Sequence, residues 1–260
     1  MIDGGAEGVR MIETPGGRLF VSDADQGSVA RALRNKGRYE KDWTAWMRAN
    51  IGAGMHVVDV GANIGYYTVL LASLVGPTGR VTACEPDPAN AALLRRSVAE
   101  NRFPHVQVVE AAVTDAEGRA TLHQDTAWHG VHSLARENTV NPGDGRVDVA
   151  TVSLDSLMRD ATADVDFVKI DAQGAEAAIV RGARRLLGQA HARVLMEIWP
   201  FGIRGLGGSL AAVITPFFEH GFSASTMEKS RQVVAVSADA IEERAAALGT
   251  WSSFNLLWIK

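Results

Sequence analysis

Cysteine is almost absent from the sequence, because Cys84 is the only thiol among 260 residues. A single cysteine excludes an internal disulfide and a zinc site built from cysteine ligands. Since Cys84 closes an apolar run, we interpret it as a small buried residue rather than a reactive thiol.

Long apolar runs are missing as well. None approaches the roughly 20 residues that a membrane-spanning helix requires. The first residues, Met1 to Glu7, carry neither the basic nor the apolar segment of a signal peptide. We therefore expect a soluble, cytoplasmic protein with no membrane partner.

An excess of positive charge is also absent, because 26 lysines and arginines stand against 30 acids, for a formal net charge of −4. Proteins that bind nucleic acids usually present a basic surface, so we expect no nucleic acid partner. The 47% of hydrophobic residues can bury a large core. Because α/β domains of this length are commonly single, we expect one main domain at 51–260 after an N-terminal extension at 1–50.

The N-terminal extension has the pattern of a hairpin followed by helices. Short strands at 9–14 and 18–21 flank a Pro-Gly-Gly turn, and helices are predicted near 29–33 and 43–47. We expect a cap of this kind beside the main domain. Its aromatic residues either attach the cap to the domain or contact a substrate, and the sequence leaves both open.

The stretch from His56 to Thr68 predicts a strand, a glycine-bracketed turn and a helix. Its valines are typical of a buried parallel strand, and the apolar residues after the turn recur at helical spacing. Gly61 and Gly65 allow a tight turn, and the helix start offers free N–H groups to a polar ligand. The dinucleotide fingerprint needs a glycine where this loop has Asn63, so we expect a nucleoside ligand without a diphosphate.

A second predicted strand ends at Glu85, twenty positions after Gly65. A carboxylate at this place can accept both hydroxyl hydrogens of a ribose. Two more strand ends carry acids, Asp171 after a strand at 165–170 and Glu197 within a strand at 193–199. Because the carboxyl ends of parallel strands meet at one edge of a sheet, we expect a ligand pocket there.

The remaining segments complete an alternating α/β pattern. Helices are expected from Pro88 to Asn101, from Gly174 to Leu187, and over 211–218 and 238–247; strands are expected over 106–110, 222–226, 233–236 and 254–259.

The segment at about 115–164 predicts an insertion on the substrate side of the domain. It contains two added strands, at 120–123 and 147–152, and a polar connection between them. That connection holds His129 and His132 next to a tryptophan and a serine, which is why we interpret it as a substrate-side loop.

Three motifs in order, Val58–Thr68, Glu85–Pro88 and Asp166–Glu176, together resemble the FkbM-type family of S-adenosylmethionine-dependent methyltransferases. The resemblance spans roughly 38–200, with a weaker echo at 255–259. It implies a class I methyltransferase (Rossmann-like) α/β fold, with a mostly parallel seven-stranded sheet and helices on both faces. It further implies S-adenosylmethionine as cofactor, S-adenosylhomocysteine as product, and O-methylation of a small molecule such as a sugar or another secondary metabolite.

The resemblance also implies which residues bind the cofactor, with its ribose on Glu85 and its adenine beside small residues after the third strand. Glu110 is ambiguous between an adenine contact and ordinary surface polarity. The residues expected to bind the cofactor are Asp59, Gly61, Asn63, Gly65, Glu85, Pro86, Glu110, Ala111, Ala112 and Asp171.

Methyl transfer to a hydroxyl requires a group that takes its proton. Asp171 is the first candidate, because the fourth strand end of this fold lies near the transferred methyl. His132 and His129 have an ordinary pKa closer to neutral pH, and Glu197 completes the set of candidate catalytic residues. Where the family usually has glutamate this chain has Gln173, which puts a metal-binding or proton-accepting role there in doubt.

We expect no metal ion, although a divalent cation held by Asp171, Glu197 and a substrate diol is an alternative. A nicotinamide-dependent oxidoreductase is a second functional hypothesis, which Glu85 permits and the incomplete glycine fingerprint disfavours. A catalytically silent S-adenosylmethionine-binding partner subunit is a third, favoured only by Gln173. The expected partner is a small hydroxyl acceptor, and the sequence leaves a homodimer open.

Overall fold

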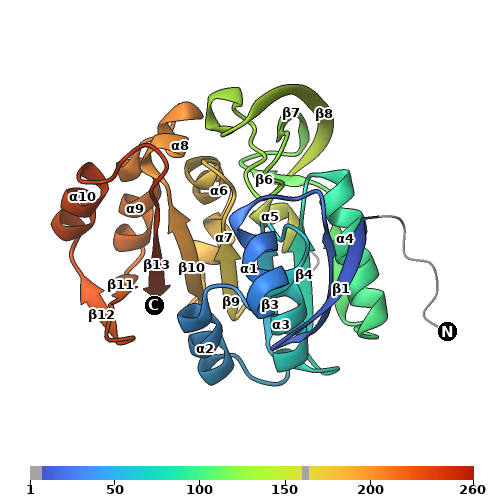
Figure 1. Ribbon diagram of the computed structural model, residues 1–260. Coiled ribbons are helices and arrows are strands. Elements are labelled where there is room, and N and C mark those ends of the chain that lie inside the picture. The colour runs from blue at the N-terminus through green and yellow to red at the C-terminus, as the bar shows by residue number, and fades with distance from the viewer. Residues whose placement is uncertain (1–7, 160–163) are drawn as a thin grey trace.

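The computed structural model describes residues 8–159 and 164–260. Within them, an eight-stranded sheet has the order β12-β11-β13-β10-β9-β3-β4-β5 (Figure 1). The bounds in that order are Val233–Val236, Ser223–Met227, Phe254–Ile259, Arg193–Ile198, Phe167–Ile170, His56–Val60, Arg80–Cys84 and Val106–Val109. Strands β5, β4, β3, β9 and β10 run parallel, and β13 is antiparallel to both β10 and β11.

The predicted α/β sheet is confirmed, but the predicted number of seven strands is wrong. The additional strand is β12, which pairs antiparallel with β11 through a short hairpin. This pairing covers the backbone groups of β11, which would otherwise lie unpaired at the edge of the sheet. The closing strand β13 lies between β10 and β11, within the sheet.

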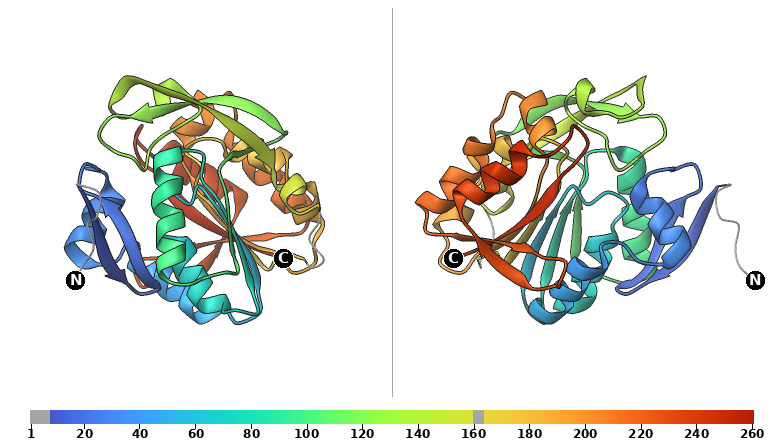
Figure 2. Two further views of the ribbon diagram at one scale, coloured as in Figure 1. Left: turned by 90° about the vertical axis from the view of Figure 1, so that its right-hand side faces the viewer. Right: turned by 60° about the vertical axis from the view of Figure 1, so that its left-hand side comes forward.

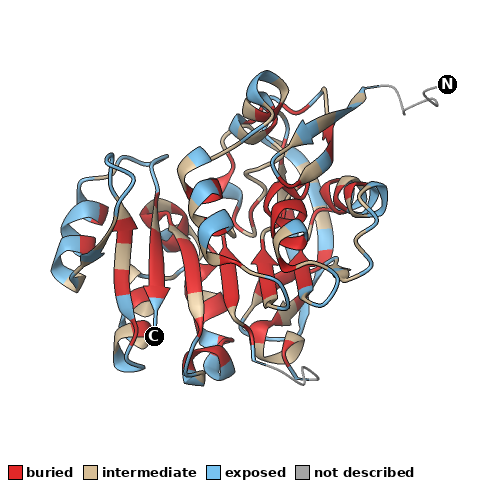
Figure 3. Cartoon of the chain, turned by 90° about the horizontal axis from the view of Figure 1, so that it is seen from below, coloured by how far each residue is buried: buried red, intermediate tan, exposed pale blue. Residues whose placement is uncertain are grey.

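Side chains of the sheet alternate between two hydrophobic cores, one on each face. Helices cover both faces (Figures 2 and 3). On one face lie α1 (Ser28–Lys36), α2 (Lys41–Asn50) and α3 (Tyr66–Val75), with α4 (Pro88–Glu100) beside them. On the other lie α5 (Leu154–Leu157), α6 (Glu176–Arg181), α7 (Arg184–Gly188), α9 (Leu210–Glu219) and α10 (Ala238–Ala246). Helices on both faces were predicted.

The single helix predicted from Gly174 to Leu187 is wrong, because the chain forms α6 and α7 with a break at Gly182. A Cβ at Gly182 would lie 2.5 Å from the carbonyl oxygen of Thr114, so the chain passes too close to its neighbour for a side chain. The carboxylate of Asp155 accepts N–H groups of Arg184 and Arg185 at 3.2 and 2.8 Å, and it thereby caps α7. A short helix α8 (Pro200–Gly205) was also not predicted.

The N-terminal residues form the predicted hairpin, β1 (Val9–Thr14) and β2 (Gly17–Ser22), followed by α1 and α2. The hairpin lies outside α3 and α4 (Figure 2). A Cβ at Gly16 would lie 2.4 Å from the Leu70 Cα, so glycine allows the turn to contact α3. Trp43 is buried in the hydrophobic core that the cap shares with one face of the sheet. The ring centre of Trp46 lies 5.9 Å from that of Phe167. These tryptophans attach the cap to the sheet. Helix α2 ends at Asn50, and the domain boundary expected there stays a prediction.

The insertion forms a separate sheet of β6 (Ala112–Thr114), β7 (Gly118–Asp125) and β8 (Pro142–Ser153), in the order β6-β8-β7. It lies above the large sheet in Figure 1. The two strands predicted there are confirmed and pair antiparallel. Residues 160–163 of this expected insertion, like Met1 to Glu7, lie outside the described residues. In the described part of the chain, no helix has the length and apolarity needed to span a membrane.

Candidate cofactor and active site

A cavity of about 310 Å³ lies at the carboxyl ends of β3, β4, β5 and β9. Its volume falls within the range of small-molecule sites. Predicted site residues that line it are Gly61, Asn63, Glu85, Pro86, Ala111, Ala112, His129, His132, Asp171 and Glu197. The structure thus brings together strand ends and an insertion loop that are far apart in the sequence.

The loop after β3 is held against the next strands by its backbone. The N–H groups of Gly61 and Ala62 both donate to the carbonyl oxygen of Cys84 at 3.0 Å. Gly61 has φ 72°, and a Cβ there would lie 1.8 Å from the Asp171 carbonyl oxygen, so only glycine fits. Asn63 has φ 51°, a left-handed conformation that asparagine tolerates better than most residues. The missing middle glycine is therefore replaced by a residue suited to the turn.

Glu85 joins this loop to the end of β4. Its Oε2 accepts the Asn63 N–H at 2.7 Å, and its Oε1 accepts the Asp87 N–H at 2.9 Å. Burial raises the pKa of Glu85 to about 7. Since a carboxylate has about four lone-pair sites, the two backbone donors leave acceptor capacity for hydroxyl groups in the cavity.

Three residues predicted to bind the cofactor do not line the cavity: Asp59, Gly65 and Glu110. Asp59 is fully buried and accepts the Thr68 hydroxyl at 2.6 Å. Glu110 is exposed and pairs with Arg95 at 2.6 Å, outside the cavity. Gly65 begins α3, where a Cβ would lie 2.4 Å from the Leu94 Cδ1. Asp59 and Gly65 thus support neighbouring elements and Glu110 lies on the surface, so none of the three is part of the cavity wall.

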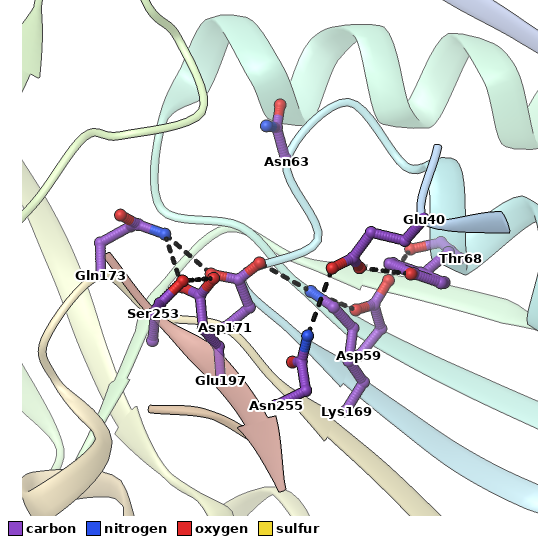
Figure 4. A network of polar contacts seen from close by, with 12 residues as sticks. Glu40, Asp59, Asn63, Thr68, Lys169, Asp171, Gln173, Glu197, Ser253 and Asn255 are labelled. Atoms are coloured by element: carbon purple, nitrogen blue, oxygen red, sulfur yellow. Dashed lines mark hydrogen bonds and ion pairs between the residues drawn. The ribbon is translucent and has the colours of Figure 1, made fainter. Parts of the chain in front are cut away.

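Lys169 is a buried cation between carboxylates (Figure 4). Its Nζ lies 3.8 Å from Asp59 Oδ1, 3.5 Å from Asp171 Oδ2 and 5.2 Å from the Tyr67 ring centre. Burial alone would lower the pKa of Lys169, but the surrounding carboxylates, led by Asp171 and Asp59, raise it above its ordinary value. Lys169 thus links the buried Asp59 to Asp171 in the cavity.

The N-terminal cap reaches the same group of charges through Glu40, which lies at the start of α2. Tyr67 donates its hydroxyl to Glu40 Oε2 at 2.5 Å. Asn255 donates its amide to Glu40 Oε1 at 3.2 Å (Figure 4). Burial raises the pKa of the Glu40 carboxyl. Residue Tyr39 of the cap also lines the cavity, so the cap contributes to the cavity wall as well as to the core.

Replacing Lys169 with methionine is expected to destabilise the protein by about 3 kcal/mol, because Asp59 would stay buried without its cation. The measurement is urea unfolding at neutral pH. Lys229→Met removes an exposed lysine and serves as the control, with an expected change within about 0.5 kcal/mol. Equal stability of the two variants would show that the buried ion pairs do not support the fold.

Four polar side chains next to Lys169 in the cavity wall contact one another: Asp171, Gln173, Glu197 and Ser253 (Figure 4). The Gln173 amide donates to Asp171 Oδ1 at 2.8 Å and to Glu197 Oε2 at 3.4 Å. Ser253 donates its hydroxyl to Glu197 Oε1 at 2.7 Å. Burial, followed by repulsion from Asp171, raises the pKa of Glu197 well above its ordinary value. Glu197 therefore tends to hold a proton beside Asp171.

The histidine loop crosses the cavity on the Glu85 side. His132 Nδ1 accepts the Asp125 N–H at 2.9 Å, so a neutral ring carries its proton on Nε2, which lies 3.8 Å from Asp87 Oδ2. Burial lowers the pKa of His132. The His129 backbone is held at both ends, since its N–H donates to Asp25 and its carbonyl oxygen accepts the Asn90 amide. The two histidines thus lie in the part of the cavity wall near Glu85. Asp171 and Glu197 instead belong to the group of contacts formed with Gln173 and Ser253.

Glu176 is a buried acid that the sequence did not single out. Its Oε1 accepts the N–H groups of Ala172 and Gly174, both at 3.3 Å, so it shapes the turn that follows Asp171. Burial raises the pKa of Glu176 to about 7. The folded state binds the Glu176 proton more tightly than the unfolded chain does. The contribution of this group to the free energy of unfolding is therefore fully present below about pH 4.5, and it is lost as the pH rises through about 7.

Glu176→Gln is expected to reduce the fall in melting temperature between about pH 5 and about pH 8, since an amide keeps the acceptor oxygen and has no proton to lose. Thermal unfolding across that range measures the effect. Glu219→Gln, at an exposed position, is expected to leave the fall unchanged. A parallel shift of the Glu176→Gln curve at every pH would contradict the assignment.

Sequence reasoning missed several residues of the cavity wall, among them Tyr39, Lys169, Trp251 and Ser253. Lys169 carried a usable signal, because a lysine inside an otherwise apolar strand requires a buried partner. Trp251 and Ser253 carried none, since they lie in a turn before the last strand. No group of three or more His, Cys, Asp or Glu able to hold a metal ion occurs in residues 8–159 and 164–260.

Comparison with known proteins gives matches to methyltransferases. The methyltransferase FkbM domain model matches residues 59–231, more than half of the chain. Methyltransferase sdnD of Sordaria araneosa is 25% identical over 185 residues, which cover 60% of this chain and 71% of that protein. A protein-L-isoaspartate O-methyltransferase of Methanothrix thermoacetophila is 36% identical over 56 residues, which cover 22% of this chain and only 27% of that relative. A candidate rRNA methylase of Clostridium thermocellum has the same fold, with a TM-score of 0.50, 11% identity and coverage of 85% of this chain and 94% of the other.

Proposed function

This chain belongs to the FkbM family of S-adenosylmethionine-dependent methyltransferases, and from that premise we propose that it methylates a hydroxyl group of a small molecule, such as a sugar or another secondary metabolite. The observation that carries the proposal is the group formed by Asp171, Gln173, Glu197 and Ser253 in the wall of the cavity. Carboxylates and hydroxyls of this kind hold and deprotonate an alcohol.

The residues at the other end of the cavity fit the cofactor. Glu85 has free acceptor capacity for ribose hydroxyls, and Ala111 and Ala112 are small residues that leave room for a flat base. The cofactor supplies a methyl group activated by a positively charged sulfur. Asp171 places a carboxylate in the cavity wall, which favours a positively charged ligand.

The protein's task in the reaction is to orient the acceptor and receive its proton. Glu197, held protonated, donates a hydrogen bond to the acceptor oxygen or to Asp171. Asp171 would accept the hydroxyl proton of the acceptor as the methyl group is transferred. Gln173 keeps the two carboxyl groups together through its two hydrogen bonds.

The other functional hypotheses make different predictions. Family membership gives no support to the nicotinamide-dependent oxidoreductase. A catalytically silent partner subunit would bind the cofactor and transfer nothing. Because neither alternative explains an acidic pair beside the cofactor pocket, O-methyl transfer is the function that the geometry supports best.

The test is incubation of the protein with S-adenosylmethionine labelled with carbon-13 in its methyl group and with fractionated metabolite extracts. The expected product carries a labelled methyl whose carbon-13 chemical shift is that of a methyl ether. A shift typical of a methyl on nitrogen, sulfur or carbon would contradict O-methylation. Cofactor binding without label transfer to any fraction would favour the silent subunit.

A further inference from the structure

Asn138 is a fully buried residue that does not line the cavity, although two of its partners do. It ends a short 3₁₀ helix, Arg136–Asn138, in the connection between β7 and β8. Its amide nitrogen lies 3.0 Å from the Gly202 carbonyl oxygen, 3.1 Å from the Gln173 carbonyl oxygen and 3.3 Å from the Ser133 hydroxyl. Because a buried amide is costly unless its donors are satisfied, this nitrogen firmly joins three separate segments of the chain.

Two glycines leave room for the Asn138 amide. A Cβ at Gly174 would lie 2.6 Å from Asn138 Nδ2, and a Cβ at Gly205 would lie 2.3 Å from Asn138 Oδ1. Gly174 directly follows Gln173, and Gly205 ends α8. The turn after β9 and helix α8 therefore both pass close to this amide, so its place is fixed by packing as well as by hydrogen bonds.

Ser133, which lines the cavity, contacts the same carbonyl oxygen of Gln173. Its hydroxyl donates to that oxygen at 2.8 Å. The Ser133 backbone is fixed as well, because it exchanges two hydrogen bonds with His123 of β7, at 2.8 and 3.1 Å. The insertion thus supplies two donors to the Gln173 carbonyl oxygen, one from Ser133 and one from Asn138.

Gln173 needs this support because its backbone conformation is unfavourable. Its φ is 49°, in the left-handed region that residues other than glycine rarely adopt. A residue keeps such a conformation only where its surroundings fix it. The Gln173 amide donates to Asp171 Oδ1 at 2.8 Å and to Glu197 Oε2 at 3.4 Å (Figure 4). Because the backbone sets the direction of the side chain, a change in the Gln173 backbone disturbs the link between these two carboxyl groups.

On the basis of the proposed O-methyl transfer, we propose that Asn138 and Ser133 are positioning residues for the reaction. They hold the Gln173 backbone so that its side chain keeps the carboxyl groups of Asp171 and Glu197 together. The insertion then has a second task besides carrying the histidine loop. It fixes the geometry of the group that orients the acceptor and receives its proton.

The first experiment uses the full chain without cofactor or acceptor and follows Glu197 by carbon-13 NMR of glutamate labelled in its side-chain carboxyl group. Glu197→Gln assigns the signal by removing it. Gln173→Ala is expected to raise the titration midpoint of Glu197 by about half a pH unit or more, because its charged form loses a hydrogen-bond donor. Asn138→Ala is expected to raise the midpoint as well, and Ser133→Ala by a smaller amount. The other charged groups that raise the pKa of Glu197 stay in every variant: Asp171, Glu176 and Glu40.

A double-variant cycle separates positioning from general damage to the fold. If Asn138 acts through the Gln173 side chain, Asn138→Ala has no further effect on the Glu197 midpoint once residue 173 is alanine. Asn50→Ala is the matched control, because the Asn50 amide also donates to a backbone carbonyl oxygen, that of Trp46 at 2.8 Å, and does not line the cavity. This control should leave the midpoint unchanged. Additive shifts in the double variant, or an unchanged midpoint in Gln173→Ala, would overturn the inference.

The second experiment measures the single-turnover rate of methyl transfer with the metabolite fraction that takes up the labelled methyl. Asn138→Ala is expected to lower this rate about tenfold or more, while the affinity for S-adenosylhomocysteine changes by no more than about twofold. Ser133→Ala is expected to lower the rate less, and Ser133→Thr, which keeps a hydroxyl, to restore most of it.

Ser133→Ala is the smaller change and carries both experiments if Asn138→Ala does not fold. A wild-type rate together with a wild-type Glu197 midpoint in Ser133→Ala would contradict the positioning role, and so would an equal loss of rate and cofactor affinity in Asn138→Ala. If the wild type transfers label to no fraction, the proposed function fails instead, and the Glu197 titration still decides whether Asn138 and Ser133 position the acidic pair.

Discussion

Replacing Asp171 with asparagine is expected to slow methyl transfer by about 10²- to 10⁴-fold, the usual contribution of a positioned proton acceptor. Asparagine keeps an oxygen that can accept the Gln173 amide, but it cannot take a proton from the acceptor hydroxyl. The affinity for S-adenosylhomocysteine should change only a few-fold, because Glu85 and the Gly61 loop remain. Single-turnover kinetics give the rate, and calorimetry gives the affinity.

Two further measurements separate a chemical role of Asp171 from a structural one. Thermal unfolding of Asp171→Asn shows whether the loss of one neighbour of Lys169 weakens the fold. Asp171→Glu restores a carboxylate at a shifted position and should recover part of the rate. If rate and cofactor affinity fell by the same factor in Asp171→Asn, the residue would be assigned to structure and Glu197 would become the remaining carboxylate candidate.

Replacing Glu85 with alanine is expected to weaken cofactor binding about 100-fold or more. Hydrogen bonds to a charged group contribute about 1.5–3 kcal/mol each, and the ribose would lose two of them. The substitution also leaves the N–H groups of Asn63 and Asp87 without their acceptor, which loosens the loop. Calorimetric titration with S-adenosylhomocysteine measures the loss.

Glu110→Ala is the matched control, because Glu110 follows the next strand of the same sheet and pairs with Arg95 outside the cavity. This substitution should change the affinity for S-adenosylhomocysteine by no more than about twofold relative to the wild type. The wild type should also bind more tightly as the pH rises from about 6 to about 8, since the pKa of Glu85 is about 7 and the charged carboxylate is the better acceptor. Equal affinities of the Glu85 and Glu110 variants would remove Glu85 from the cofactor site.

Local patterns in the sequence were sufficient to predict the family and most of the helices and strands. The valines of β3, the glycine-bracketed turn and the apolar spacing of α3 specify strand, turn and helix through neighbouring residues alone. Acids at successive strand ends placed Glu85, Asp171 and Glu197 at one edge, because parallel strands end on the same side. The family and its cofactor, predicted from three motifs, are confirmed by the family match.

Only the tertiary structure decided which of these residues meet and which do not. Asp59 lies within β3 and is buried beside Lys169, whereas Glu85 lies just past the end of β4 and reaches the cavity wall. The break between α6 and α7 depends on the close passage of Thr114 past Gly182. Ser253 reaches Glu197 because β13 is inserted beside β10 from the end of the chain. Such contacts join positions tens to hundreds of residues apart, and they depend on packing that no local pattern encodes.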